Sequence, residues 1–315
     1  MCTELLTMPI LPRRELAFAL TPGETRVEVV RPDGALSASF APAPLGREAA
    51  RGTLVLIHGV ASNASRWEEF TERTPLRRDW NVVRLDLRGH AASVTTVPAT
   101  LEKHAEDLVA LLDALEIRRA VWVGHSLGAQ IAMMTATLYP ERTAGLVLLD
   151  PLVDEALTPK AEKMAARRPL VRALEGWGRF LHAVGWRRRL PHYSLREHDQ
   201  RAREMLKAGG DALEAFIKEY SSPWRDLGHI HLEHYMRDLL ETGRPSPDIR
   251  GLGIPVLVFG SRSGSFTGPV RMARWVEGMP GGAYETVPCV HWPLTECPDE
   301  VSGAMAAWLG RTFPG

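Results

Sequence analysis

A serine between two glycines is the strongest chemical signal in this sequence. Residues 124–128 read Gly-His-Ser-Leu-Gly, a G-x-S-x-G pattern with Ser126 at its centre. An apolar run at residues 120–123 precedes the pattern, and a helical pattern at 127–138 follows it. A serine at such a tight strand-to-helix turn is held above the edge of the sheet, close to the partial positive charge of a helix N-terminus. The pattern in this context predicts a nucleophilic serine, with a glycine-bounded turn and an incidental serine as the alternative.

Two other segments carry groups that a serine nucleophile needs. A His-Gly pair ends the apolar run at residues 54–57, and the next residue is Val60. The backbone N–H groups of Val60 and Leu127 are therefore predicted to form an oxyanion hole. His291 lies near the C-terminus, so the chain order is serine then histidine. We expect His291 to act as the general base, and a packed loop histidine is the alternative.

The elements that would position these residues follow from hydrophobic patterning. Strand-like runs occur at residues 25–30, 35–40, 54–57, 81–85, 120–123, 146–149, 255–259 and 284–287. From residue 53 onward, strands alternate with helical patterns, which predicts a mainly parallel sheet with helices on both faces. The alternation stops between residues 151 and 247, where only amphipathic helices are expected. We predict an N-terminal arm (1–23), an α/β core (24–151 and 251–315) and a helical insertion (152–250).

The sequence resembles the α/β-hydrolase superfamily, in its cap-bearing branch of esterases, C–C hydrolases and haloperoxidase-like proteins. The resemblance covers about residues 24–151 and 252–310. Its motifs are LIHG (56–59), DLRGH (86–90), GHSLG (124–128), LVLLD (146–150) and VHWP (290–293). It implies an eight-stranded sheet with a helical cap inserted after the sixth strand, and an acyl-enzyme formed on Ser126 without a cofactor. A serine at this position argues against haloalkane dehalogenases and epoxide hydrolases, whose nucleophile is an aspartate.

The third member of a catalytic triad is the point where the resemblance breaks. Relatives usually carry an acid shortly after the seventh strand, but no carboxylate occurs between Phe259 and Glu277. Some relatives place the acid after the sixth strand, where Asp150 follows the apolar run. We expect Asp150 to be the orienting acid, with Asp154 as the reserve. A Ser–His dyad is the third interpretation.

Aromatic residues and histidines are expected to line a substrate pocket under the insertion. The candidates are Trp177, Trp186 and Trp292, together with His125 beside the nucleophile. No metal site is expected, because the histidines of the insertion lack a matching set of cysteine or carboxylate ligands. The arginine triplet at 187–189 is interpreted as a solvated helix edge, with a carboxylate clamp as the alternative.

Composition limits the classes of partner. The 315 residues include 38 Lys+Arg and 38 Asp+Glu, and this balance argues against nucleic-acid binding through bulk charge. No apolar run is long enough for a transmembrane helix, and no secretory signal is readable, so we expect a cytoplasmic protein without a membrane partner. Three scattered cysteines predict no disulfide framework. The expected partner is a small-molecule substrate; the oligomeric state is open, with a homodimer as one option.

These features together predict a serine hydrolase that cleaves an ester, a thioester, a lactone or an activated C–C bond. The alternative is a cofactor-free cyclase, lyase or acyltransferase on the same scaffold, an interpretation that the missing acid motivates. A non-catalytic ligand-binding protein is the third interpretation.

Overall fold

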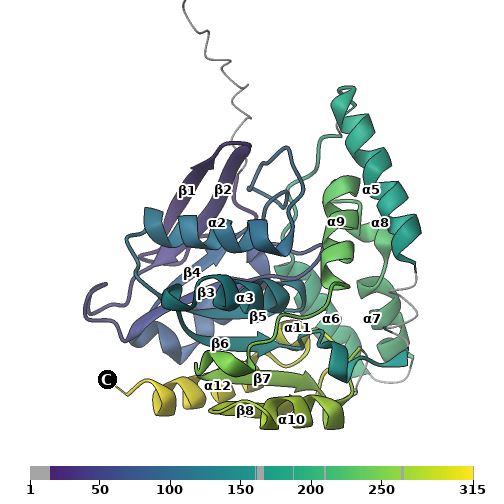
Figure 1. The fold of residues 1–315 in the computed structure, drawn as a ribbon. Helices are drawn as coiled ribbons and strands as arrows, with labels where there is room; N and C mark the ends of the chain where they lie inside the picture. Colours follow the sequence, from purple (N-terminus) through teal and green to yellow (C-terminus); the bar gives the residue numbers. More distant parts are fainter. Residues whose placement is uncertain are drawn as a thin grey trace, which may run out of the picture.

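An eight-stranded sheet forms the centre of the computed structural model, which describes residues 15–159, 161, 167–186, 188–208, 211–263 and 266–314 (Figure 1). The strands are β1 (Thr25–Arg31), β2 (Gly34–Ala41), β3 (Gly52–Ile57), β4 (Trp80–Leu85), β5 (Ala120–His125), β6 (Thr143–Leu149), β7 (Val256–Ser261) and β8 (Gly282–Val287). Their order across the sheet is β1-β2-β4-β3-β5-β6-β7-β8. The pairs β1–β2 and β2–β4 are antiparallel, and the other five are parallel. The predicted mainly parallel, eight-stranded sheet is confirmed.

The helices follow the strands in chain order. The α-helices are α1 (Glu68–Arg73), α2 (Leu101–Ala114), α3 (Leu127–Leu138), α5 (Arg168–Ala183), α6 (Arg196–Ala208), α7 (Ala212–Tyr220), α8 (Pro223–Asp226), α9 (Leu232–Thr242), α10 (Pro269–Glu277), α11 (Pro293–Glu296) and α12 (Pro298–Thr312). Short 3-10 helices are η1 (Ala64–Trp67), η2 (Pro75–Arg78), η3 (Pro140–Arg142), η4 (Asp154–Ala156) and η5 (Arg250–Leu252). In the described part of the chain, no helix has the length and apolar character needed to cross a membrane.

Two hydrophobic cores lie on the two faces of the sheet. Helices α2, α3 and α10 contribute to one core, and α1 and α12 contribute to the other. Strand β3 shows the division, because Val55 and Ile57 join the first core while Leu54 and Leu56 join the second. Successive side chains of a strand point to opposite faces of its sheet. Burial on both faces therefore explains the unbroken apolar run in the sequence.

Helices α5 to α9 lie between β6 and β7 in the chain and gather at one end of the sheet (Figure 1). The described residues of 152–250 form no strand of the sheet, in agreement with the helical pattern. Helix α9 packs on the loop after β4, where His90 Nε2 lies 3.1 Å from Asp238 Oδ2. A Cβ atom on Gly89 would lie 2.0 Å from His234 Nδ1, so only glycine leaves room for this helix. The domain boundaries drawn from the sequence stay a prediction.

The last residues of the predicted N-terminal arm pack against the sheet. Phe18 is buried, and the Arg84 guanidinium lies 3.8 Å above its ring. The Glu24 carboxylate accepts hydrogen bonds from Arg84 Nε (2.8 Å) and Nη2 (2.7 Å), and both side chains are buried. A bidentate pair of this kind satisfies two buried charges together. Residues 1–14 of the arm lie outside the described part of the chain.

Candidate active site

Ser126 stands at a sharp turn between β5 and α3. Its backbone has φ 53° and ψ −115°, a strained conformation for a residue with a side chain, and its N–H donates to the Leu149 carbonyl (3.0 Å). The two flanking glycines make the turn sterically feasible. A Cβ atom on Gly124 would lie 2.2 Å from the Gly128 carbonyl oxygen, and one on Gly128 would lie 2.3 Å from the Ile57 carbonyl oxygen. The G-x-S-x-G spacing is therefore a packing requirement of this turn.

The loop after β3 lies directly against this turn. A Cβ atom on Gly59 would lie 3.4 Å from the Ser126 Cβ and 3.2 Å from the His125 carbonyl oxygen. Val60 follows Gly59 in this loop, and Leu127 begins helix α3. The N–H groups in the first turn of a helix have no acceptor within that helix. Both predicted oxyanion donors thus belong to backbone segments that flank the serine.

Two histidines hold the loop after β3 in place. His58 Nδ1 contacts the Gly59 carbonyl (2.8 Å), and His58 Nε2 accepts a hydrogen bond from Leu87 N–H (2.9 Å). From the insertion, His229 Nε2 contacts the carbonyl of Ala61 (2.9 Å), a residue with φ 48°. Burial lowers the pKa of His229 to about 4 and that of His58 well below its usual value. Both rings are therefore neutral near pH 7, and each donates one hydrogen bond to a carbonyl of this loop.

His291 and Asp150 meet although 141 residues separate them in the chain. His291 Nδ1 lies 2.5 Å from Asp150 Oδ2, and both side chains are buried. Asp150 follows β6 with φ 45°, and its Oδ1 accepts a hydrogen bond from Ser261 N–H (3.1 Å). The last residue of β7 thus contributes a backbone donor to the carboxylate, while the hydroxyl of Ser263, in the loop after β7, donates to the Val290 carbonyl (3.2 Å).

Asp154, the reserve acid, lies elsewhere. Its carboxylate is exposed and accepts a hydrogen bond from Ser246 N–H (2.7 Å). Of the two carboxylates considered, the structure brings only Asp150 to the histidine.

His125 contacts the histidine loop rather than open space. Its Nε2 lies 2.8 Å from the carbonyl oxygen of His291, so this nitrogen carries the proton and donates. Burial, followed by the charge of His291, lowers the pKa of His125 well below its usual value. The sequence led us to expect a substrate-binding side chain here. The structure shows in addition that His125 holds the backbone of His291 through this contact.

Glu296 organises the same loop and was not singled out from the sequence. Its Oε1 accepts hydrogen bonds from the N–H groups of Val290 (3.0 Å), His291 (3.2 Å) and Trp292 (3.0 Å). Burial raises the pKa of Glu296, and these donors oppose that change. An acid five residues after the histidine is the only sequence signal for this role. No comparable signal marks His229, because its contact depends on how the insertion folds back.

Trp292 connects the histidine loop to the insertion. Its ring packs edge-on against Phe216 (5.3 Å between centroids) and Tyr220 (5.4 Å) of helix α7. This side chain was expected to bind substrate, and the structure shows that it also forms part of an apolar cluster with the insertion.

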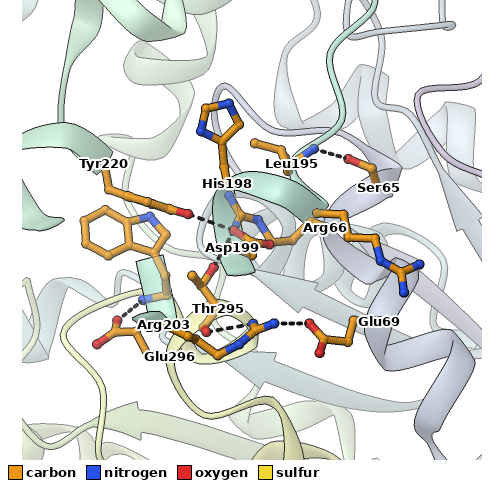
Figure 2. A network of polar contacts seen from close by, with 12 residues as sticks. Ser65, Arg66, Glu69, Leu195, His198, Asp199, Arg203, Tyr220, Thr295 and Glu296 are labelled. Atoms are coloured by element: carbon orange, nitrogen blue, oxygen red, sulfur yellow. Dashed lines mark hydrogen bonds and ion pairs between the residues drawn. The ribbon is translucent and has the colours of Figure 1, made fainter. Parts of the chain in front are cut away.

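A polar network continues this connection, and Figure 2 shows it from close by. Asp199 of α6 accepts hydrogen bonds from the hydroxyls of Tyr220 (3.0 Å) and Thr295 (3.1 Å), and it pairs with Arg66 of η1. Arg203 bridges the Thr295 carbonyl (3.1 Å) and the Glu69 carboxylate (2.6 Å). The insertion is therefore anchored within four residues of His291 by buried, charge-assisted hydrogen bonds.

A cavity of about 220 Å³ lies beside the loop after β3. Ser62 and Asn63 line it from the core, and Tyr193 and His229 line it from the insertion. The Tyr193 and His229 rings stack with 4.1 Å between centroids. Residues of the insertion thus form one wall of this cavity, opposite Ser62 and Asn63, which follow Val60 closely in the chain.

The two remaining aromatic candidates lie on the surface. Trp177 is 55 % exposed and Trp186 is 74 % exposed, both in or next to α5. This placement differs from the enclosed pocket expected for them, because the sequence periodicity shows a helix face but not what covers it. In the described part of the chain, no three His, Cys, Asp or Glu side chains converge as metal ligands would.

The sheet and the turn at Ser126 together define an α/β-hydrolase fold. A model of the Alpha/beta hydrolase family matches residues 54–304, and the chain belongs to this family. The resemblance seen in the sequence is confirmed at this level.

Individual relatives cover part of the chain. A lipase, LipV, from Mycobacterium tuberculosis is 36 % identical over 100 residues, which are 32 % of this chain and 37 % of the lipase. An sn-1-specific diacylglycerol lipase from Danio rerio is 32 % identical over 97 residues, or 31 % of each chain. The chain thus spans about a third of the length of these curated relatives.

Solved structures match over nearly the full length. A thermophilic esterase from Thermogutta terrifontis has a TM-score of 0.62 at 22 % identity, covering 92 % of this chain and 99 % of the esterase. The enol-lactonase from Burkholderia xenovorans has a TM-score of 0.60 at 19 % identity, covering 87 % and 96 %. At this identity the similarity establishes the fold alone.

The close packing at the serine turn predicts opposite effects for two glycine substitutions. Gly128→Ala should lower the free energy of unfolding by about 3 kcal/mol or more, because the new methyl group meets backbone oxygen atoms that cannot move aside. Gly303→Ala, on the exposed side of α12 with no atom within 4 Å, should raise it by about 0.5–1 kcal/mol. Urea unfolding of both variants measures the difference. Equal midpoints would contradict the tight contact between the two loops.

Two substitutions of Glu296 separate the effect of its charge on His291 from its role in positioning the histidine loop. Glu296→Gln can keep Oε1 as an acceptor of all three N–H groups and removes the negative charge beside His291, at the cost of the bond from Val290 N–H to Oε2 (2.8 Å). Without that charge the protonated imidazole is less favourable, so the acid limb of the pH–rate profile should move to lower pH by about half a unit. Glu296→Ala removes the acceptor as well and should lower kcat about tenfold or more.

The assay for these variants is hydrolysis of a p-nitrophenyl ester as a function of pH. Glu300→Gln, an exposed acid in α12, is the matched control and should leave the profile unchanged. A Glu296→Gln profile that coincides with the wild type would show that the carboxylate exerts no electrostatic effect on the histidine.

Proposed function

We propose that this protein is a serine hydrolase of carboxylic esters or of a related acyl bond, namely a thioester, a lactone or an activated C–C bond. In this proposal Ser126 is the nucleophile, His291 the general base and Asp150 the orienting acid. The observation that carries the proposal is the 2.5 Å hydrogen bond between His291 Nδ1 and Asp150 Oδ2. It supplies a charged partner for the histidine although the loop after β7 carries no carboxylate.

The reaction would begin with proton transfer from the Ser126 hydroxyl to His291 Nε2. Asp150 accepts Nδ1–H, so Nε2 of the neutral ring is left as the proton acceptor, and the imidazolium that forms is stabilised. The serine oxygen attacks the carbonyl carbon of the substrate, and the carbonyl oxygen becomes an oxyanion. The N–H groups of Val60 and Leu127 stabilise this charge.

The tetrahedral intermediate then collapses, and His291 returns its proton to the leaving group. Water attacks the acyl-enzyme with His291 again acting as general base, which releases the acid and regenerates Ser126. No step needs a cofactor. In this proposal residues 152–250 form a cap over the site, supported by the anchor at Asp199 and by the contact of His229 with the loop after β3.

A fluorophosphonate probe tests the nucleophile. We expect the wild-type protein to be labelled at one site, and the label to be lost in Ser126→Ala and in His291→Ala. Ser302→Ala is the matched control, because Ser302 is 8 % exposed and Ser126 is 7 % exposed. Labelling of this control should equal that of the wild type. A folded wild-type sample that takes up no label would contradict a serine mechanism.

Replacement of Asp150 tests the triad against a dyad. Asp150→Asn keeps the volume of the side chain but removes the charge that stabilises the imidazolium, so kcat should fall about 10³- to 10⁴-fold with KM little changed. Asp154→Asn, four residues further along the chain and exposed, should retain full turnover. Steady-state kinetics on a p-nitrophenyl ester measures both. Unchanged turnover in Asp150→Asn would overturn the triad and favour a Ser–His dyad.

A further inference from the structure

Helix α5 presents an apolar stripe to solvent. Leu170 (61 % exposed), Leu174 (37 %), Trp177 (55 %) and Val184 (61 %) lie on one side of the helix, or directly after it, at steps of three, four and seven residues. Phe180 (55 %) stacks beside Trp177 with 5.6 Å between centroids. Exposed apolar side chains are common singly, whereas a continuous stripe of large ones marks an interaction surface.

The other side of α5 already has its partner. A Cβ atom on Gly178 would lie 2.9 Å from the Glu233 backbone nitrogen, so α5 and α9 are in close contact there. His182 Nδ1 contacts Glu233 Oε1 (3.0 Å), and Glu175 pairs with Arg237 of α9 (2.6 Å). The covered side of α5 thus carries Val171, Glu175 and Gly178, and among the described residues no element covers the apolar stripe. Figure 1 shows α5 at the periphery of the molecule, with α9 on its inner side.

The charge of this segment differs sharply from that of the whole chain. Residues 167–189 contain seven arginines and one acidic residue, Glu175, so their net charge is +6 in a protein with 38 cations and 38 anions. Arg172 and Arg179 are exposed along α5, and Arg188 and Arg189 are exposed just beyond its end. The long arginine side chains can extend alongside an apolar surface while their guanidinium groups reach anionic groups.

The positive charge and the convex shape of helix α5 together indicate the kind of partner that it can bind. A symmetric contact with a second copy would place two surfaces of the same charge against each other, because each copy presents the same patch. Another protein would need a groove complementary to a convex helix. An anionic lipid surface meets both conditions, since it supplies negative headgroups and adapts to the shape of an apolar stripe.

We propose that α5 is an interfacial helix that docks this protein onto anionic phospholipid surfaces. The rings of Trp177 and Phe180 and the side chain of Leu170 enter the boundary between headgroups and acyl chains, and the arginines contact phosphate groups. The helix has 16 residues and lies in the plane of the surface. This proposal departs from the expectation of no membrane partner, which rested on the lack of a transmembrane run and of a secretory signal, because an interfacial helix needs neither. The proposal is independent of the chemistry assigned to Ser126.

Co-sedimentation of the full-length protein with lipid vesicles tests the proposal. Vesicles of phosphatidylcholine containing about one-third phosphatidylglycerol should bind the protein, and vesicles of phosphatidylcholine alone should not. Binding should weaken as salt is raised, because salt screens the arginines. Arg172→Gln and Arg179→Gln should each lower the partition coefficient about fivefold.

Two further variants separate the apolar stripe from a general change in stability. Leu170→Asp should abolish vesicle binding, whereas Val270→Asp, at a site 66 % exposed near the start of α10, should bind as the wild type does. Both should hydrolyse a water-soluble p-nitrophenyl ester at the wild-type rate, which shows that they are folded. If neither the wild type nor the variants hydrolyse the ester, the proposed chemistry is contradicted. Vesicle binding still tests the interfacial helix, because the two assays are independent.

Three results would overturn the proposal. The wild type fails to bind anionic vesicles, Leu170→Asp binds them as the wild type does, or light scattering without lipid shows a dimer that Leu170→Asp converts to a monomer. The last result would assign the stripe to a second copy of this chain.

Discussion

The arrangement of the site depends on one hydrogen bond, between His291 Nδ1 and Asp150 Oδ2. It joins the residue after β6 to the loop after β8, two segments that the parallel sheet brings to the same edge. Asp150 reaches the histidine from a backbone conformation with positive φ, and its second oxygen is occupied by Ser261 N–H. Carboxylate and ring are both buried, where a charged partner stabilises an imidazolium more strongly than it would in water.

The loops around this bond are held by neutral histidines and one acid. His58, His125 and His229 each contact a backbone carbonyl, and burial lowers the pKa of each ring. A buried neutral imidazole has one donor nitrogen, so each of these contacts also determines which nitrogen carries the proton. Glu296 fixes the histidine loop through three N–H groups. Because these loops are already held in position, their backbone N–H groups can stabilise a charge that develops on a substrate without a rearrangement of the loops.

The insertion has two different surfaces. Toward the core it carries paired charges, such as Asp199 with Arg66, and aromatic contacts with Trp292. Away from the core, α5 carries exposed aromatic and aliphatic side chains and a concentration of arginine. Buried charges on the inner surface are paired because unpaired ones would be too costly. On the outer surface, Arg179 lies 3.9 Å from Glu175 and Arg188 donates to the Ile230 carbonyl (3.4 Å), while Arg172 and Arg189 are exposed.

Much of the fold could be predicted from the sequence because its signals are local. Short apolar runs or alternating patterns identified the eight strands, and the glycines around Ser126 identified the turn. Serine and histidine candidates followed from motifs and chain order. The acid did not, because Asp150, Asp154 and a dyad were all compatible with the sequence.

Only the tertiary structure shows which of these carboxylates lies against the histidine, since a contact across 141 residues depends on strand order and loop path. The same limit applied to His125, whose neighbours in sequence do not reveal that it faces His291. It applied again to Trp177, because periodicity shows that a helix has an apolar side but not whether another element covers it. The sequence by itself determined the elements and the types of reactive side chain. Which of those side chains meet, and which remain on the surface, depended on long-range packing that no local pattern records.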